Sequence, residues 1–215
     1  MSAPDPSKRD VQISKALSYL LRHGAIKEKL NIDEEGYIKI QDILSHNRIK
    51  THRVTVEDIH RIVRGNDKQR FSIVNRNGIE YICATQGHSI ESVSEANLRS
   101  LTREEMPREV FHGTYKAKLP SIMNEGLSRM GRNHIHFASC ESNVSGIRKN
   151  CNVLIYLNID DCFDKGITFY KSANGVVLTR GLNGILPSTL FDRVIDVSTG
   201  NSIVNKAALA ELSEK

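Results

Sequence analysis

The sequence predicts an α+β protein of two lobes, and three observations support this class. The first half contains amphipathic helical stretches followed by two alternating strands around an Asn-Gly turn. The second half consists of short strands with one or two helices, and a polar, charged stretch separates the halves. We expect a loose tail over 1–9, a first lobe over 10–95, a linker over 96–107 and a second lobe over 108–215.

The first helix is expected over 10–23, where apolar residues recur near the helical period. Asp10 is its expected N-cap, and Gly24 is expected to end it. Arg22 and His23 then fall on the last turn, where the helix dipole favours cations.

The rest of the first lobe is predicted to hold a short strand and helix over 36–49, a further helix and a hairpin. Thr55 and Asp58 form a capping box at the start of the further helix, and Gly65 ends it. The hairpin spans 70–83 around an Asn-Gly turn, which is a strong hairpin signal. Helices followed by a β-hairpin predict a winged-helix-like lobe.

Positive charge concentrates between Ser45 and Arg76. Eight Lys and Arg residues stand against three acidic residues there, a local sum of +5 (Arg48, Lys50, Arg53, Arg61, Arg64, Lys68, Arg70 and Arg76 against Glu57, Asp58 and Asp67). The functional interpretation is a surface that follows the phosphates of a nucleic acid. The alternative is a solvated helix face.

The second lobe is predicted to be mostly β. Strands are expected over 109–114, 133–138 and 153–159, with a helix over 119–124. Residues 168–179 predict another hairpin that turns at a second Asn-Gly pair.

The composition excludes several function classes. Thirty Lys and Arg against 25 Asp and Glu give a net charge of +5, which permits an anionic partner without requiring one. The chain lacks Trp, so it has few aromatic side chains with which to recognise a nucleic acid by base stacking alone. P-loop, GxGxxG, HExxH and GxSxG motifs are absent from the sequence.

The expected environment is intracellular. No apolar run approaches the roughly 18 residues of a membrane span, and the polar N-terminus lacks a signal-peptide core. Four cysteines without a CxxC pair indicate free thiols in a reducing compartment (Cys83, Cys140, Cys151 and Cys162). We expect a soluble protein of the cytoplasm, the nucleus or both, monomeric and without a membrane partner.

A metal site is conceivable but not expected. His134 and His136 share one face of a strand, and His112 or Cys140 could join them. Because their spacing matches no zinc pattern, one buried, hydrogen-bonded histidine is the better interpretation.

Three arginines and one histidine are candidates for an oxyanion pocket. Arg22 and His23 follow a rigid apolar helix. Arg70 opens one strand, and Arg132 precedes another. Each taken alone is most simply a surface residue, but together they could hold a phosphate, because guanidinium groups bind oxyanions in a bidentate manner.

Six segments carry a resemblance to a known family. They cover about residues 10–197 in the family's order and are LSYLLRH (17–23), NDKQRF (66–71), ATQGHS (84–89), HGT (112–114), RNHIHF (132–137) and SANGVVLT (172–179). The chain resembles the NAD-dependent RNA 2′-phosphotransferases, which are the tRNA 2′-phosphotransferases of fungal tRNA splicing and their bacterial relatives.

The resemblance implies a fold and a reaction. A winged-helix RNA-binding lobe would precede an ADP-ribosyltransferase-like, mixed β lobe that binds NAD. The enzyme would remove the internal 2′-phosphate left at the splice junction of ligated tRNA by transferring it to NAD. The phosphate would displace nicotinamide to give 2′-phospho-ADP-ribosylated RNA, and the ribose 2″-hydroxyl would then attack phosphorus. The products would be 2′-hydroxyl RNA, nicotinamide and ADP-ribose 1″,2″-cyclic phosphate.

The resemblance also assigns residues. The catalytic set would be Arg22, His23, Arg70 and Arg132. NAD, a co-substrate, would be bound by His112, Gly113, Thr114, Asn133 and His134, and RNA would be contacted by Arg64, Lys68, Gln86 and His88. No metal is implied. Several cations suit this reaction, because a phosphate dianion must approach a co-substrate that carries a pyrophosphate.

Two other functions remain open at this point. The chain could transfer ADP-ribose to another acceptor, such as a terminal nucleic-acid phosphate or a protein. It could instead be a non-enzymatic nucleic-acid binder that uses the basic stretch, although this would leave the second half of the chain without a role.

Overall fold

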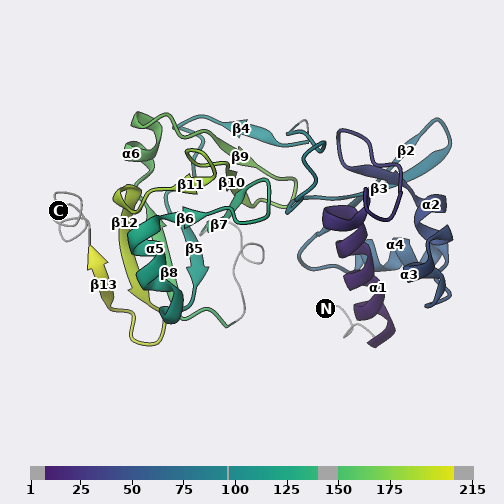
Figure 1. The fold of residues 1–215 in the computed structure, drawn as a ribbon, viewed down its shortest axis with the longest axis horizontal. Coiled ribbons are helices and arrows are strands. Elements are labelled where there is room, and N and C mark those ends of the chain that lie inside the picture. Colours follow the sequence, from purple (N-terminus) through teal and green to yellow (C-terminus); the bar gives the residue numbers. More distant parts are fainter. Residues whose placement is uncertain (1–7, 96, 140–149, 206–215) are drawn as a thin grey trace. The chain divides into compact units, whose positions relative to one another are not determined.

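The computed structural model describes residues 8–95, 97–139 and 150–205 (Figure 1). The chain divides into two compact units, unit 1 (residues 1–97) and unit 2 (residues 98–215). Each unit combines helices with a β-sheet around a hydrophobic core of its own. The predicted α+β class is therefore confirmed.

Unit 1 packs its helices against a three-stranded antiparallel sheet of order β1-β3-β2 (Figure 1). Its elements are α1 (Lys8–Tyr19), a π-helical turn (Leu20–Gly24), β1 (Tyr37–Lys39), α2 (Ile40–Ser45), α3 (Asn47–Lys50), α4 (Val56–Arg64), β2 (Phe71–Arg76) and β3 (Ile79–Ala84). The core lies between α1 and the sheet, where Ile13, Leu17 and Ile82 are fully buried.

The short-range signals of unit 1 are confirmed. Strands β2 and β3 pair up to Arg76 and Ile79, and the two residues between them are Asn77 and Gly78 with φ values of 53° and 81°. Positive φ at both positions gives the turn a twist that matches the strands. The Thr55 side chain caps α4, with the reciprocal bond from the Thr55 backbone to the Asp58 carboxylate at 3.1 Å.

The first helix differs from its prediction at its start and in the form of its last turn, which is π-helical. It begins at Lys8, and Asp10 is not its N-cap but lies in the first turn, 2.8 Å from the Arg61 guanidinium. The helical path ends at Gly24 as predicted, but Gly24 has no positive φ, and Ala25 after it keeps φ −50° and ψ −49°. Gly24 also gives room to a neighbour, since a Cβ there would lie 2.5 Å from Cε1 of Tyr19.

Parts of the expected tail and of the expected linker form regular secondary structure. Residues 1–7 lie outside the described residues, and Lys8 and Arg9 belong to α1. Within the segment 96–107, Arg99–Leu101 forms the strand β4 and pairs with Phe169–Lys171.

Unit 2 is built on an eight-stranded sheet of order β13-β12-β8-β5-β7-β10-β9-β4, with β6 and β11 as a separate pair (Figure 1). Its strands are β4, β5 (Val110–Thr114), β6 (Leu127–Ser128), β7 (Ile135–Ser139), β8 (Val153–Leu157), β9 (Phe169–Lys171), β10 (Val177–Thr179), β11 (Ile185–Leu186), β12 (Phe191–Asp196) and β13 (Ser202–Asn205). Its helices are α5 (Leu119–Glu125) and α6 (Ile159–Asp164), with short 3-10 turns at Lys116–Lys118 and Ser188–Leu190.

The predicted strands of unit 2 and its helix near residue 119 all form. The hairpin β9–β10 differs in its turn, because Ser172 closes a longer loop by donating its N–H to the carbonyl of Val176 at 3.0 Å. Gly175 supplies the positive φ of 80° that this loop needs. Among the described helices, none is long and apolar enough to cross a membrane.

Candidate functional site

In unit 1, Arg22 and His23 lie on the π-helical turn that continues α1. Leu20 and Leu21 on the same turn are fully buried, whereas Arg22 is half-buried and His23 is exposed. The buried leucines anchor the turn in the core, so the side chains of Arg22 and His23 extend from a backbone that is held in place. A π-helical turn inside a helix is rare and is frequently found at functional sites.

The segment 84–89 joins this turn to the strand that starts after Arg70. The N–H of Ser89 donates to the carbonyl of Arg22 at 2.9 Å, and the Ser89 hydroxyl lies 2.9 Å from Nδ1 of His23. At the other end, the N–H of Thr85 donates to the carbonyl of Arg70 at 3.0 Å. Three of the segments that carry the family resemblance are thus held together within unit 1.

The Arg70 side chain is held by a tight turn just before it. Nη1 of Arg70 donates to Oδ1 of Asn66 at 3.1 Å, and the N–H of Lys68 donates to the same oxygen at 3.1 Å. Gln69 has φ 44°, and its carbonyl accepts from the Thr85 hydroxyl at 2.9 Å. The turn therefore fixes both the backbone and the guanidinium of Arg70.

The residues predicted to contact RNA are spread over unit 1. Arg64 is exposed at the end of α4, and Lys68 is half-buried in the turn before Arg70. Gln86 and His88 are half-buried in the segment 84–89. Gly36 packs closely against His88, because a Cβ on Gly36 would lie 3.0 Å from Nε2 of His88.

Part of the basic stretch is neutralised inside unit 1. The guanidinium of Arg61 lies 2.8 Å from Asp10 and 2.6 Å from Asp58, and Arg48 lies 3.1 Å from Glu28. Hydrogen bonds from Arg9, from the Thr55 backbone and from Arg61 hold the pKa of Asp58 well below its usual range. Arg76 likewise pairs with Asp33 and Glu35. Arg48, Arg61 and Arg76 are therefore matched by carboxylates.

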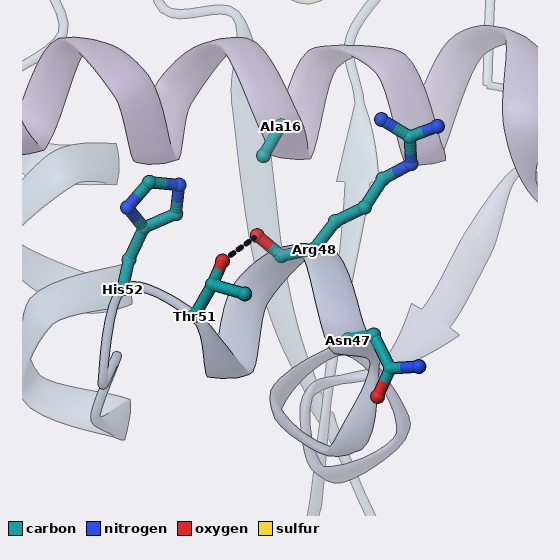
Figure 2. A pocket seen from close by; sticks show the side chains of 5 residues that line it. All are labelled: Ala16, Asn47, Arg48, Thr51 and His52. Atoms are coloured by element: carbon teal, nitrogen blue, oxygen red, sulfur yellow. Dashed lines mark hydrogen bonds between the residues drawn. The ribbon is translucent and has the colours of Figure 1, made fainter.

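A shallow, open groove lies between α1 and α3 (Figure 2). Ala16 is on its α1 side, and Asn47, Arg48, Thr51 and His52 line it from α3 and the residues after it. None of the predicted catalytic, NAD-binding or RNA-binding residues lines this groove. Its one arginine is already engaged, because the guanidinium of Arg48 stacks 4.5 Å from the ring centroid of Tyr19.

In unit 2, His112, Gly113 and Thr114 lie on β5, inside the sheet between β8 and β7. His112 is half-buried, and its Nδ1 lies 2.9 Å from the carbonyl oxygen of His136. Because that oxygen can only accept, Nδ1 of His112 carries a proton. Gly113 and Thr114 are buried.

His134 lies just before β7 and is 8% exposed. Its ring meets the ring of Tyr170 edge-on, at 5.9 Å between centroids. The burial in the prediction of one buried, hydrogen-bonded histidine is confirmed for His134. Among the described residues, no group of three or more His, Cys, Asp or Glu side chains could hold a metal ion. Cys140 lies outside the described residues.

Arg132 is exposed on the loop between β6 and β7, and Asn133 after it is half-buried. The N–H of Arg132 donates to the carbonyl of Arg129 at 3.2 Å, and Nη1 of Arg129 donates to the carbonyl of Arg132. The N–H of Arg129 donates to the carbonyl of Gly184 at 2.9 Å. Arg129 therefore fixes the backbone of the Arg132 loop.

The sequence of residues 8–181 matches the family model described as RNA 2′-phosphotransferase, Tpt1 / KptA family. The chain belongs to this family. The match takes in the described parts of unit 1 and most of unit 2.

Several curated proteins are similar to this member of the Tpt1 / KptA family over most of their length. It is 45% identical to the tRNA 2′-phosphotransferase of Saccharomyces cerevisiae, over 87% of this chain and 84% of the yeast protein. It is 39% identical to tRNA 2′-phosphotransferase 1 of Danio rerio, over 86% of this chain and 85% of the fish protein. It is 34% identical to the probable RNA 2′-phosphotransferase of Rhodopirellula baltica, over 80% of this chain and 91% of the bacterial protein.

Sequence reasoning did not single out three residues that hold the candidate side chains of this family member. They are Asn66, which holds Arg70, Ser89, which contacts His23, and Arg129, which fixes the Arg132 loop. Asn66 and Ser89 lie inside segments that resemble the family, which is the only signal that pointed to them. Nothing local shows that Ser89 meets a histidine 66 residues earlier in the chain.

Proposed function

We propose that this chain removes the internal 2′-phosphate left at the splice junction of ligated tRNA and transfers it to NAD. The observation that carries the proposal is the match of residues 8–181 to the Tpt1 / KptA family. Relatives at 38–45% identity from yeast to cattle are named tRNA 2′-phosphotransferases, which supports tRNA as the substrate.

The two units would divide the substrates between them. Unit 1 is proposed to be a winged-helix-like RNA lobe, which is supported by its helices and the β2–β3 hairpin added to a short third strand. Unit 2 is proposed to be an ADP-ribosyltransferase-like lobe that binds NAD, which is supported by its mixed structure around a large antiparallel sheet. Arg64, Lys68, Gln86 and His88 are the RNA contacts proposed in unit 1.

The proposed catalytic residues act on the transferred phosphate. Arg22, His23 and Arg70 come from unit 1 and Arg132 from unit 2. A guanidinium that is already fixed stabilises the charge that develops on phosphorus without having to reorganise. Arg70 meets this requirement through Asn66, whereas the contacts of Arg129 fix the loop backbone from which the Arg132 side chain extends.

The residues proposed to bind NAD are His112, Gly113, Thr114, Asn133 and His134. Gly113 has no side chain on an inner strand, which lets a ligand approach the backbone closely. His112 is held by the carbonyl of His136 with its Nδ1 protonated, so its Nε2 can only accept a hydrogen bond while the ring is neutral. His134 is fixed by Tyr170 and by its burial.

The proposed reaction has two steps, and in each step one bond forms while another breaks. An oxygen of the RNA 2′-phosphate forms a bond to C1″ of the NAD ribose, and the bond from C1″ to nicotinamide breaks. The ribose 2″-hydroxyl then attacks phosphorus and loses its proton, while the RNA 2′-oxygen leaves and gains one. His23 is proposed to move this proton, and the arginines offset the negative charge that accumulates.

A defined substrate tests the proposal. The protein is mixed with NAD and an RNA oligonucleotide that carries one internal 2′-phosphate, and the products are separated by chromatography and mass. We expect 2′-hydroxyl RNA, nicotinamide and ADP-ribose 1″,2″-cyclic phosphate in equal amounts. Unchanged RNA would refute the proposal, and ADP-ribose that stays attached to a terminal phosphate would indicate the other acceptor chemistry.

A further inference from the structure

Ser89 contacts two consecutive residues of the π-helical turn. Its N–H donates to the carbonyl of Arg22 at 2.9 Å, and its hydroxyl donates to the same carbonyl at 3.4 Å. The hydroxyl oxygen also lies 2.9 Å from Nδ1 of His23. One side chain therefore connects the backbone of Arg22 to the imidazole of His23.

The segment that carries Ser89 is well fixed. The following residue, Ile90, is buried in the core of unit 1. Gly87 has φ 88°, which turns the chain just before Ser89. Thr85 ties the start of the segment to the backbone of Gln69 and Arg70. Ser89 can therefore hold its partner in place, whereas an exposed imidazole without such a contact samples several rotamers.

Two contacts of the hydroxyl bear on which imidazole nitrogen carries a proton. A carbonyl oxygen can only accept, so the contact with Arg22 is made when the Ser89 hydroxyl donates its single proton to that carbonyl. In this arrangement Nδ1 of His23 donates to the Ser89 oxygen at 2.9 Å, whereas a hydroxyl turned towards Nδ1 would reverse that hydrogen bond. In the first arrangement, Nε2 of the neutral ring has the lone pair.

We propose that Ser89 is a positioning residue for His23, which fixes the ring with Nδ1 protonated and leaves Nε2 to exchange protons with the reacting groups. This inference rests on the proposed function, in which His23 moves a proton between the 2″-hydroxyl and the RNA 2′-oxygen. Proton transfer through Nε2 is possible in both directions, because Ser89 accepts from Nδ1 whether the ring is neutral or charged.

Three variants test the role of the hydroxyl in turnover. Ser89→Ala removes it, Ser89→Thr keeps it, and Ser45→Ala removes an exposed serine at the end of α2 as a matched control. We expect Ser89→Ala to lower kcat about tenfold with the KM for NAD unchanged, which is the effect of losing roughly one hydrogen bond to a charged group. Ser89→Thr and Ser45→Ala should keep kcat within about twofold of the parent.

The proton on the ring is measured directly. Long-range ¹H–¹⁵N spectra of the full chain report which nitrogen of a neutral imidazole is protonated, and His23→Gln identifies the His23 signals. We expect the Nδ1–H form in the parent and in Ser89→Thr, and a mixture of both forms in Ser89→Ala. A parent protein with His23 in the Nε2–H form would overturn the proposal, even if Ser89→Ala fails to fold.

The outcomes separate this inference from the proposed function. If Ser89→Ala loses turnover but keeps the parent's ring signals, Ser89 has only a structural role and the proposal is wrong. Parent turnover in Ser89→Ala would also overturn it. If the parent protein does not release the 2′-phosphate, the proposed function fails, whereas the ring spectra still show whether Ser89 fixes His23.

Discussion

Replacing Gly24 with alanine tests how the turn that carries Arg22 and His23 is built. A Cβ at Gly24 would lie 2.5 Å from Cε1 and 2.8 Å from Cζ of Tyr19. Carbon atoms pack at about 3.5–4.0 Å, so either the Tyr19 ring or the backbone of the turn must move.

The Tyr19 ring does not move without loss. The Arg48 guanidinium stacks on it at 4.5 Å from the centroid, and its hydroxyl donates to Glu28 at 3.4 Å. Inserting a methyl group into such a site costs about 1–3 kcal/mol, and alanine returns at most about 1 kcal/mol through its helix propensity. We therefore expect Gly24→Ala to lower the free energy of unfolding of unit 1 by about 1–2 kcal/mol.

The assay must report on unit 1 alone, because two units need not unfold together. Urea denaturation of the full chain provides this readout when unfolding is monitored by hydrogen exchange of peptides from residues 8–95. The control is Gly24→Ala in a Tyr19→Ala background, where the ring is gone and the second substitution should be neutral or slightly stabilising. If Gly24→Ala costs the same in both backgrounds, contact with Tyr19 is not the reason for this glycine.

Three further predictions concern the candidate site and the stability of unit 2. Arg132→Ala should lower kcat by about 100-fold or more and leave the melting temperature unchanged, because Arg132 is exposed; turnover close to that of the parent would remove it from the mechanism. Asn66→Asp should raise the KM for 2′-phosphorylated RNA about tenfold with little effect on folding, because the new carboxylate would neutralise Arg70 and repel the phosphate; an unchanged KM would show that the charge of Arg70 is not used. Hydrogen bonds from Lys116 and Ser198 lower the pKa of Asp196 from 3.8 to about 2, so this carboxylate stabilises unit 2 above its ordinary pKa, and the contribution is lost as the pH falls from about 3.8 to 2. Urea midpoints between pH 5 and 2 should fall more steeply in the parent than in Asp196→Asn, and equal slopes would contradict this.

The parts of the fold that the sequence predicts are those encoded within a few residues. The Asn77-Gly78 turn and the Thr55 capping box each need only four neighbouring residues, and both form as expected. Strands β12 and β13 and helix α6 went unpredicted. These strands are defined by their pairing with other segments, as β12 is by β8, rather than by their own pattern.

Gly24 shows how a local rule can give the right boundary for another physical reason. Glycine after a basic last turn is a typical helix stop, because it tolerates positive φ. Here the π-helical turn does end at Gly24, but without positive φ, and the glycine accommodates the ring of Tyr19 from the same helix. The rule concerns backbone conformation, whereas this position is determined by packing.

The candidate site could be predicted as a set of residues but not as an arrangement. The resemblance placed Arg22 and His23 in one segment and Arg70 in another, and the structure joins these two segments through residues 84–89. Hydrogen bonds between residues 66 positions apart leave no periodic signal in a single sequence. The positioning contacts therefore emerge only from the fold.

The partners of the arginines in unit 1 explain why the local charge of +5 is a poor measure of phosphate binding. Arg61 and Arg76 face carboxylates, so each pair presents little net charge to a ligand. Arg70 is held instead by the neutral amide oxygen of Asn66. A neutral partner fixes the guanidinium but cancels none of its charge, so the attraction for a dianion is retained. This difference in partner agrees with the proposed role of Arg70, because Arg61 and Arg76 are engaged by carboxylates whereas Asn66 offsets none of the charge of Arg70.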